Sequence, residues 1–168
     1  MTSQSQIKKA GLGDVAILVG LIREAYRDVA QRFDLTPENC PKHPSNCTPQ
    51  WIRKDFARSV SYFILEDNHK PVGCAALEKP TTDLGYLERL AVLPDHRRRG
   101  FGKMLVDYVF ERAKEAGLKQ ISIGIVAEQT DLLWWYRKIG FIEGDTKEFE
   151  HLPFLVTFMK YQLPGKAD

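Results

Sequence analysis

The sequence lacks the features that mark membrane and secreted proteins. No apolar run approaches the ~18 residues that a membrane-spanning helix needs. Residues 1–6, MTSQSQ, do not begin the basic and then apolar order of a secretory signal. The chain has only three cysteines, an odd number, which predicts reduced thiols rather than a disulfide framework. We therefore expect a cytoplasmic protein that does not associate with a membrane.

The chain also lacks a strong excess of one charge. Its formal net charge of +2 is too small to argue by itself for a nucleic-acid partner. Apolar residues make up 43% and charged residues 27%, as in ordinary globular proteins, and 168 residues fit a single domain over 1–168. No internal repeat stands out. We expect a monomer or a homodimer that binds no nucleic acid.

Apolar periodicity and turn residues predict strands and helices in alternation. Helices are expected over residues 14–33, 51–58, 102–116 and 130–139, and strands over 7–10, 62–66, 72–77, 84–93, 119–126 and 154–163. The strand–helix–strand unit in the middle implies a parallel pair with a right-handed crossover. The hairpins on either side imply antiparallel pairing. The predicted fold class is α/β, with a mixed, mostly antiparallel central sheet, a central parallel strand pair and helices on both faces.

The most informative stretch is residues 87–103, LERLAVLPDHRRRGFGK. An apolar strand ends at Pro94, and three arginines are followed by Gly100, Phe101 and Gly102, where an amphipathic helix begins. Free N–H groups, a helix N-terminus and clustered cations meet at this point, and each of them favours a phosphate. The glycines let the backbone approach a ligand closely. The pattern predicts a pyrophosphate site, against the alternative of a solvated charged turn.

These residues resemble the phosphate loop of the GNAT superfamily, the GCN5-related N-acetyltransferases. The family pattern is Arg or Gln, two residues, Gly, one residue and then Gly or Ala, and Arg97, Gly100 and Gly102 match it. The preceding residues 90–94 are similar to the end of the family's fourth strand. Downstream, residues 135–141, WYRKIGF, resemble a second signature, a tyrosine on a short helix that closes with Lys-x-Gly-Phe. The two signatures occur in the family's order and at a typical separation.

The resemblance implies a GNAT-like fold and an N-acetyltransferase that moves the acetyl group of acetyl-CoA to a primary amine by direct attack on the thioester. In the family, main-chain groups at the end of the fourth strand bind the pantetheine arm and face the thioester oxygen. The loop that follows binds the pyrophosphate, mainly through N–H groups, and its outer arginines are expected to be partly positional. Many relatives carry an asparagine after the fifth strand, which a longer amide could replace here. The implied cofactor-binding residues are Leu90, Ala91, Val92, Arg97, Arg98, Arg99, Gly100, Phe101, Gly102, Lys103 and Gln129.

Two catalytic residues are predicted. The family places its general acid at the position of Tyr136, whose phenol has an ordinary pKa of about 10 and can donate a proton to a thiolate. The alternative is a packing role, because Trp134 and Trp135 precede it. Glu88 is the expected general base on the strand that leads to the thioester, since the corresponding position on the next strand is Gly124. The alternatives are an ion pair for Glu88 and proton transfer to water.

Cys40, His43 and Cys47 form a Cys-x2-His-x3-Cys cluster. Zinc prefers four ligands and no fourth is close in sequence, so no metal is expected. By analogy with the family, this loop and residues 151–154 shape the acceptor pocket. Two other functions stay open: an acyl-CoA-binding sensor without catalysis, and a zinc-dependent interaction protein. The acceptor stays open among peptide amino-termini, lysine side chains, polyamines, aminoglycosides and small metabolite amines.

Overall fold

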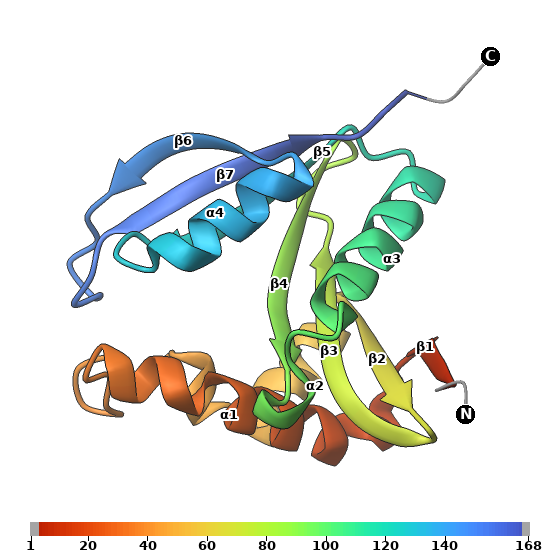
Figure 1. Cartoon of the computed structure of the whole chain (residues 1–168), viewed down its shortest axis with the longest axis horizontal. Helices are drawn as coiled ribbons and strands as arrows, with labels where there is room; N and C mark the ends of the chain where they lie inside the picture. Colours follow the sequence, from red (N-terminus) through yellow and green to blue (C-terminus); the bar gives the residue numbers. More distant parts are fainter. Residues whose placement is uncertain (1–3, 166–168) are drawn as a thin grey trace.

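One seven-stranded sheet organises the computed structural model, which describes residues 4–165 (Figure 1). The strands lie in the order β1-β2-β3-β4-β5-β7-β6. Neighbouring strands are antiparallel except β4 and β5, which are parallel. The predicted fold class is therefore confirmed. The strands are β1 (Ser5–Lys9), β2 (Ser61–Asp67), β3 (Lys70–Glu78), β4 (Leu84–Val92), β5 (Gln120–Val126), β6 (Ile142–Lys147) and β7 (Val156–Gln162).

In the described part of the chain, four α-helices cover the two faces of the sheet. α1 (Val15–Arg32) and α2 (Pro49–Ala57) pack on one face, and α3 (Phe101–Glu115) and α4 (Thr130–Ile139) on the other. Strand alternation divides β2 between these layers, because Ile64 packs with α1 and α2 while Leu65 packs with α3. Burial of each such side chain contributes about 1.5–3 kcal/mol to the free energy of unfolding. None of the helices in residues 4–165 has the length and apolar character needed to cross a membrane.

The parallel strands β4 and β5 separate after a short paired segment. Leu84–Tyr86 lies beside Gln120–Ser122, and beyond these residues the two strands are no longer paired (Figure 1). β4 nevertheless continues to Val92 and β5 to Val126. An unpaired strand edge presents N–H and C=O groups that seek partners. The split between β4 and β5 is therefore a natural place for a ligand.

A β-bulge interrupts β4 at this split. Between the pairs Glu88–Ala76 and Ala91–Cys74, two residues of β4 oppose one residue of β3. The first of the two, Arg89, has φ +51°, a left-handed conformation that costs a non-glycine residue about 1–2 kcal/mol. The surrounding structure must hold this residue in place, so the bulge is a conformationally constrained part of β4.

Several boundaries and one strand differ from the sequence prediction. β1 and β3 each begin two residues earlier than predicted, at Ser5 and Lys70. α2 begins at Pro49 rather than at residue 51, because Thr48 caps it and its hydroxyl accepts a hydrogen bond from the N–H of Trp51. The last strand begins at Val156, two residues later than predicted. β6 was not predicted, because all six of its residues are exposed and therefore show no alternation of buried and exposed positions.

Candidate functional site

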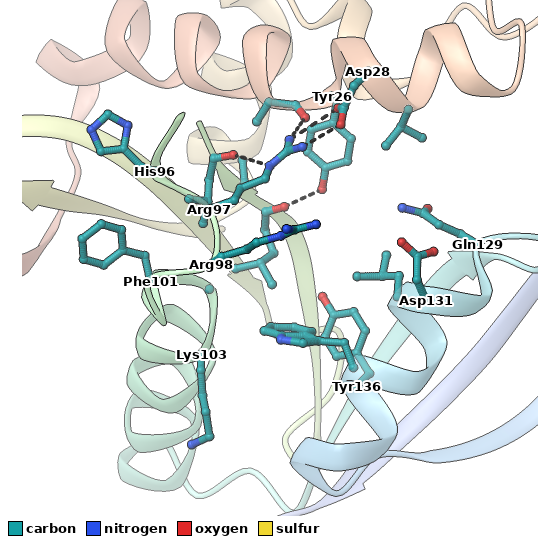
Figure 2. Close-up of a pocket in the computed structure, with 18 of the residues that line it drawn as sticks. Tyr26, Asp28, His96, Arg97, Arg98, Phe101, Lys103, Gln129, Asp131 and Tyr136 are labelled. Carbon is teal, nitrogen blue, oxygen red and sulfur yellow. Dashed lines mark hydrogen bonds and ion pairs between the residues drawn. The ribbon is translucent and has the colours of Figure 1, made fainter. Parts of the chain in front are cut away.

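A cavity of about 510 Å³ lies at the split between β4 and β5, with α1 on one side and α4 on the other (Figure 2). It also reaches the N-terminus of α3. Ten of the eleven residues predicted to bind a cofactor line it: Leu90, Ala91, Val92, Arg97, Arg98, Gly100, Phe101, Gly102, Lys103 and Gln129. The fold thus brings to one place segments that are separated in the sequence. We name this space the first cavity.

The N-terminus of α3 opens into the first cavity without a side-chain cap within residues 4–165. Gly100, directly before the helix, has φ +81°, a left-handed conformation that favours glycine. The N–H groups of residues 101–103 belong to the first turn and have no partner inside the helix, so they can bind an anion. A Cβ on Gly102 would lie 3.2 Å from the ring of Trp135, which shows how closely α4 approaches α3 here.

The side chain of Arg97 connects α1 to β4. Its guanidinium donates to the carbonyl oxygen of Ala25 at 2.6 Å and to that of Val92 at 3.1 Å. It also forms an ion pair with Asp28 at 2.6 Å. Three partners leave this side chain little freedom to move toward a phosphate, so its role in the loop is largely positional.

The other two arginines of the loop point to different places. Arg99 lies 3.9 Å from Asp67 on β2 and does not line the first cavity, unlike the other predicted cofactor residues. Arg98 does line the cavity and makes no ion pair with residues 4–165. Lys103 lines it too, although its ammonium pairs with Asp107 at 2.9 Å. Arg98 is therefore the arginine best placed to meet an anion at the N-terminus of α3.

The edge of β4 that faces the first cavity offers N–H donors. The N–H of Leu93 donates to the carbonyl oxygen of Val72 on β3 at 2.9 Å. The backbone groups of Leu90 and Val92, which alternate with those of Ala91 and Leu93, therefore point the opposite way, into the split. Their carbonyl oxygens already accept hydrogen bonds, Leu90 from the hydroxyl of Tyr26 at 2.9 Å and Val92 from Arg97. Their N–H groups lie on the same side of the strand as these carbonyl oxygens and therefore face the split as well. This edge is therefore suited to a ligand that brings carbonyl oxygens.

Tyr136 extends from α4 into the first cavity (Figure 2). It is 5% exposed, and the rings of Trp135 and Phe141 pack edge-on against it, with centroids 4.9 and 5.2 Å away. Burial raises the pKa of Tyr136 well above its usual range, and the proximity of Tyr26 adds to this shift. The phenol is therefore protonated throughout the physiological range and can serve as a proton donor.

Tyr26 is a cavity residue that the sequence prediction missed. Its hydroxyl points into the first cavity from α1, opposite Tyr136 (Figure 2). Its ring packs edge-on against the buried His43 of the α1–α2 loop, with centroids 5.8 Å apart. Burial raises the pKa of Tyr26 as well. The apolar periodicity that predicted a helix over residues 14–33 gave no signal that would single out this tyrosine.

A second cavity, of about 780 Å³, contains the predicted base. Glu88 lines it together with Tyr86, Gly124 and Phe158, and does not line the first cavity. Residues that pair directly in a sheet have their side chains on the same face, so the register places these four residues on the face that carries α1 and α2. The two helices cover this face only over β2–β4 and leave it open over β5 and β7. Glu88 stands two residues beyond the last pairing of β4 with β5, at the start of the split. The expected acid and base therefore line different cavities.

Glu88 has an environment that favours its protonated form. Burial raises the pKa of Glu88 to about 7, and Glu78 adds to this as a hydrogen-bond partner and as a like charge, while Arg89 opposes it. Glu78 lies diagonally across on β3 and is held by Arg58 at 2.5 Å, and Arg58 also binds Asp55 at 2.8 Å. A carboxyl group that titrates near neutral pH is suited to general base catalysis.

The strained Arg89 is anchored by α2. Its guanidinium lies 3.4 Å from the carboxylate of Asp55 and 5.6 Å from the ring centre of Trp51. Tyr62 of β2 donates a hydrogen bond to the same carboxylate at 2.5 Å, and Asp55 is 5% exposed. These contacts fix the bulge of β4 from the face that carries Glu88.

The cysteine and histidine side chains of the α1–α2 loop serve packing. Cys40 packs with Leu152 and Phe154 of the loop before β7, and the Nδ1 atom of His43 lies 2.7 Å from the hydroxyl of Ser45. Within residues 4–165, no group of three His, Cys, Asp or Glu side chains is placed to hold a metal ion. The two loops expected to shape an acceptor pocket are therefore in contact.

The chain is similar in sequence to known acetyltransferases. A family model described as "Acetyltransferase (GNAT) family" matches residues 23–141. The amino-acid acetyltransferase of Yersinia enterocolitica is 25% identical over 147 residues, which make up 86% of this chain and 29% of that protein. The chain thus spans less than a third of the length of this curated relative.

Solved structures share the fold at low sequence identity. The ribosomal-protein-S18-alanine N-acetyltransferase of Escherichia coli superimposes with a TM-score of 0.77 at 15% identity, over 98% of this chain and 97% of that one. A GNAT family acetyltransferase from Elizabethkingia anophelis with acetyl-CoA bound gives a TM-score of 0.71 at 17% identity, over 95% and 98% of the two chains. At these identities the likeness is one of fold.

Proposed function

The chain belongs to the acetyltransferase (GNAT) family, and from this premise we propose that it is an N-acetyltransferase that moves the acetyl group of acetyl-CoA to a primary amine. The observation that carries the proposal is the split between β4 and β5. It joins a cavity rich in N–H donors, with Tyr136, to the place where Glu88 enters a second cavity. A thioester and an amine could meet there from the two faces of the sheet.

The donors of the first cavity suit acetyl-CoA. The pyrophosphate would lie at the N-terminus of α3 beside Arg98, where N–H groups and a cation favour an anion. The pantetheine arm would follow the edge of β4, with its carbonyl oxygens toward the N–H groups of Leu90 and Val92. Gln129, directly before α4, would contact the arm from the other side. The neighbour from Elizabethkingia anophelis, with its bound acetyl-CoA, supports this assignment.

The proposed reaction is a direct transfer. The amine nitrogen attacks the carbonyl carbon of the thioester, the carbon–sulfur bond breaks, and the amine loses a proton to the Glu88 carboxylate. The departing thiolate takes the proton of Tyr136. Solvent then returns a proton to Tyr136, and Glu88 releases its proton to solvent. An N–H of the β4 edge would stabilise the developing oxyanion, an interaction that contributes about 3–4 kcal/mol in well-studied enzymes.

The acceptor is proposed only as a primary amine. The two named relatives act, by their descriptions, on an amino acid and on an alanine of ribosomal protein S18. Both descriptions are compatible with a carboxyl base that titrates near neutral pH and takes a proton from an amine. We also propose a cytoplasmic location, which the three free cysteines Cys40, Cys47 and Cys74 support.

An amine panel tests the proposal. The chain is mixed with acetyl-CoA and with amino acids, peptides with free amino-termini, lysine peptides, polyamines and aminoglycosides, and free CoA is measured. At least one class should release CoA together with an equal amount of acetylated amine. If the chain binds acetyl-CoA but no amine class is acetylated, it is an acyl-CoA-binding sensor instead.

A further inference from the structure

We propose that Tyr26 is a positioning residue for this reaction, whose hydroxyl holds the carbonyl of Leu90 so that the N–H of Leu90 faces the thioester oxygen. The inference rests on the proposed function, because it needs a thioester in the first cavity. It concerns a residue of α1, far in sequence from both motifs that point to the cofactor.

The first argument is the replacement of a missing strand. β5 leaves β4 after Tyr86, so the edge of β4 at the bulge has no strand to hold it. The hydroxyl of Tyr26 donates to the carbonyl oxygen of Leu90 at 2.9 Å and thus takes the place of the neighbouring strand. Both backbone groups of a strand residue point to the same side. Fixing the carbonyl of Leu90 therefore also fixes the direction of its N–H group.

The second argument is strain. Arg89, directly before Leu90, has φ +51°, so the peptide that follows it is held in a conformation that a free chain would leave. Asp55 and Trp51 of α2 anchor Arg89 from one face of the sheet. Tyr26 of α1 anchors the next residue from the cavity side. The bulge is thus held at two consecutive residues by two different helices.

The third argument is a division of tasks between two phenols. Tyr26 and Tyr136 face each other across the first cavity (Figure 2). The proton of Tyr26 is committed to Leu90, whereas the hydroxyl of Tyr136 donates no hydrogen bond within residues 4–165. Burial keeps Tyr26 protonated, so the bond to Leu90 persists at any physiological pH. Tyr26 is therefore suited to orient the backbone and Tyr136 to give up a proton.

The infrared stretch of the thioester carbonyl tests this role directly. Acetyl-CoA labelled with ¹³C at the acetyl carbonyl is bound to the parent, where donation from Leu90 should shift the stretch below its value in free acetyl-CoA. In Tyr26→Phe the stretch should return at least halfway to the free value. The kcat should fall about tenfold, as expected for the loss of one aligned hydrogen bond, while the KM for acetyl-CoA changes less than about twofold.

A matched control and a second variant complete the test. Tyr161→Phe also removes one tyrosine hydroxyl, but its ring stacks on Phe110 outside the cavity, so stretch and kcat should stay at parental values. If Tyr26→Phe does not fold, 4-aminophenylalanine at position 26 replaces it. This side chain keeps the ring and offers a weaker hydrogen-bond donor, so the stretch and kcat should move part of the way toward the values expected for loss of the bond.

The outcomes separate the two proposals. If the parent shifts the carbonyl stretch and the Tyr26 variant shows the same shift and the same kcat, the positioning role of Tyr26 is overturned. The acetyltransferase proposal would still stand. A parent that does not bind acetyl-CoA overturns both. A parent that binds acetyl-CoA with an unshifted stretch overturns the positioning role, because no oxyanion donor is then present to position.

Discussion

Glu88 is the residue that should set the pH dependence of the reaction. A general base must be ionised to act, so kcat/KM should fall about tenfold per pH unit as pH drops below the pKa of about 7. Glu88→Gln should remove this fall in kcat/KM, the acidic limb of the pH profile. Glu78→Gln should move the limb to lower pH, because it removes the like charge that helps to raise the pKa of Glu88. Initial rates between pH 5 and pH 9 measure these profiles.

The amine also loses a proton as pH rises, so the variants and not the parent limb alone identify the group. Glu111→Gln, on the exposed side of α3, is the matched control and should keep the parental profile. Superimposable profiles for the parent and Glu88→Gln would show that water takes the proton. Glu88 would then be a structural residue of the sheet.

Tyr136→Phe should lower kcat by about 10²–10⁴-fold, the range for loss of a general acid. The ring would still pack between Trp135 and Phe141, so the affinity for acetyl-CoA should stay within about twofold of the parent. Stopped-flow release of CoA and equilibrium titration measure the two quantities. A kcat close to that of the parent would reduce Tyr136 to a packing residue.

At the residue scale, sequence predicts what is local. Nine of the ten predicted cofactor residues that line the first cavity lie within residues 90–103, a contiguous motif, while Gln129 was expected only from the family resemblance. The positions of Tyr26, Asp55 and Glu78 could not be predicted, because each acts through a partner on another element. Arg99 was grouped with its neighbours but turns to Asp67, since successive residues of a loop need not share a direction.

Among the elements, the N-terminus of α3 allows a closely matched pair of substitutions. Gly100 and Gly117 flank the two ends of α3, both have φ +81°, and neither has an atom within 4 Å of its missing Cβ. Gly100→Glu places a negative charge at the proposed pyrophosphate site, whereas Gly117→Glu imposes the same strain at the other end. A ligand that binds only the folded state at a hundred times its Kd stabilises it by about 2.7 kcal/mol. Acetyl-CoA should therefore raise the Tm of the parent and of Gly117→Glu, but not of Gly100→Glu.

Equal Tm increases in the two glycine variants would contradict an anion site at this helix end. Comparing the two variants without ligand gives the cost of the backbone strain together with the effect of the helix dipole, which favours a glutamate at position 100 and disfavours one at position 117. The comparison therefore separates the binding of acetyl-CoA from the folding of the chain.

α2 supports the bulge of β4, and its contribution can be measured as stability. Asp55→Ala removes the carboxylate that binds Arg89 and Tyr62 and leaves a largely buried guanidinium without its partner. Such a loss typically costs about 3–5 kcal/mol of unfolding free energy. Urea titration measures it, with Glu115→Ala as control, since that exposed pair with Arg112 contributes at most about 1 kcal/mol. Equal effects of the two variants would show that the cluster does not hold the bulge.

Across the whole molecule, the split sheet places the two cavities on either side of one point. β4 and β5 share three residue pairs, and beyond these the strands diverge around the first cavity while Glu88 enters the second. The sequence predicted the crossover unit, because the strand–helix–strand order is local. It could not predict the divergence, because no residue of either strand forbids longer pairing.

Initial-velocity kinetics at varied concentrations of both substrates test most directly whether the acetyl group passes straight from the first cavity to an amine in the second. A direct transfer requires both substrates to be bound together, so double-reciprocal lines should intersect, and mass spectrometry of the chain incubated with acetyl-CoA alone should show no added acetyl group. Parallel lines together with an acetylated chain would contradict a direct transfer across the split, because the acetyl group would then pass through a covalent intermediate.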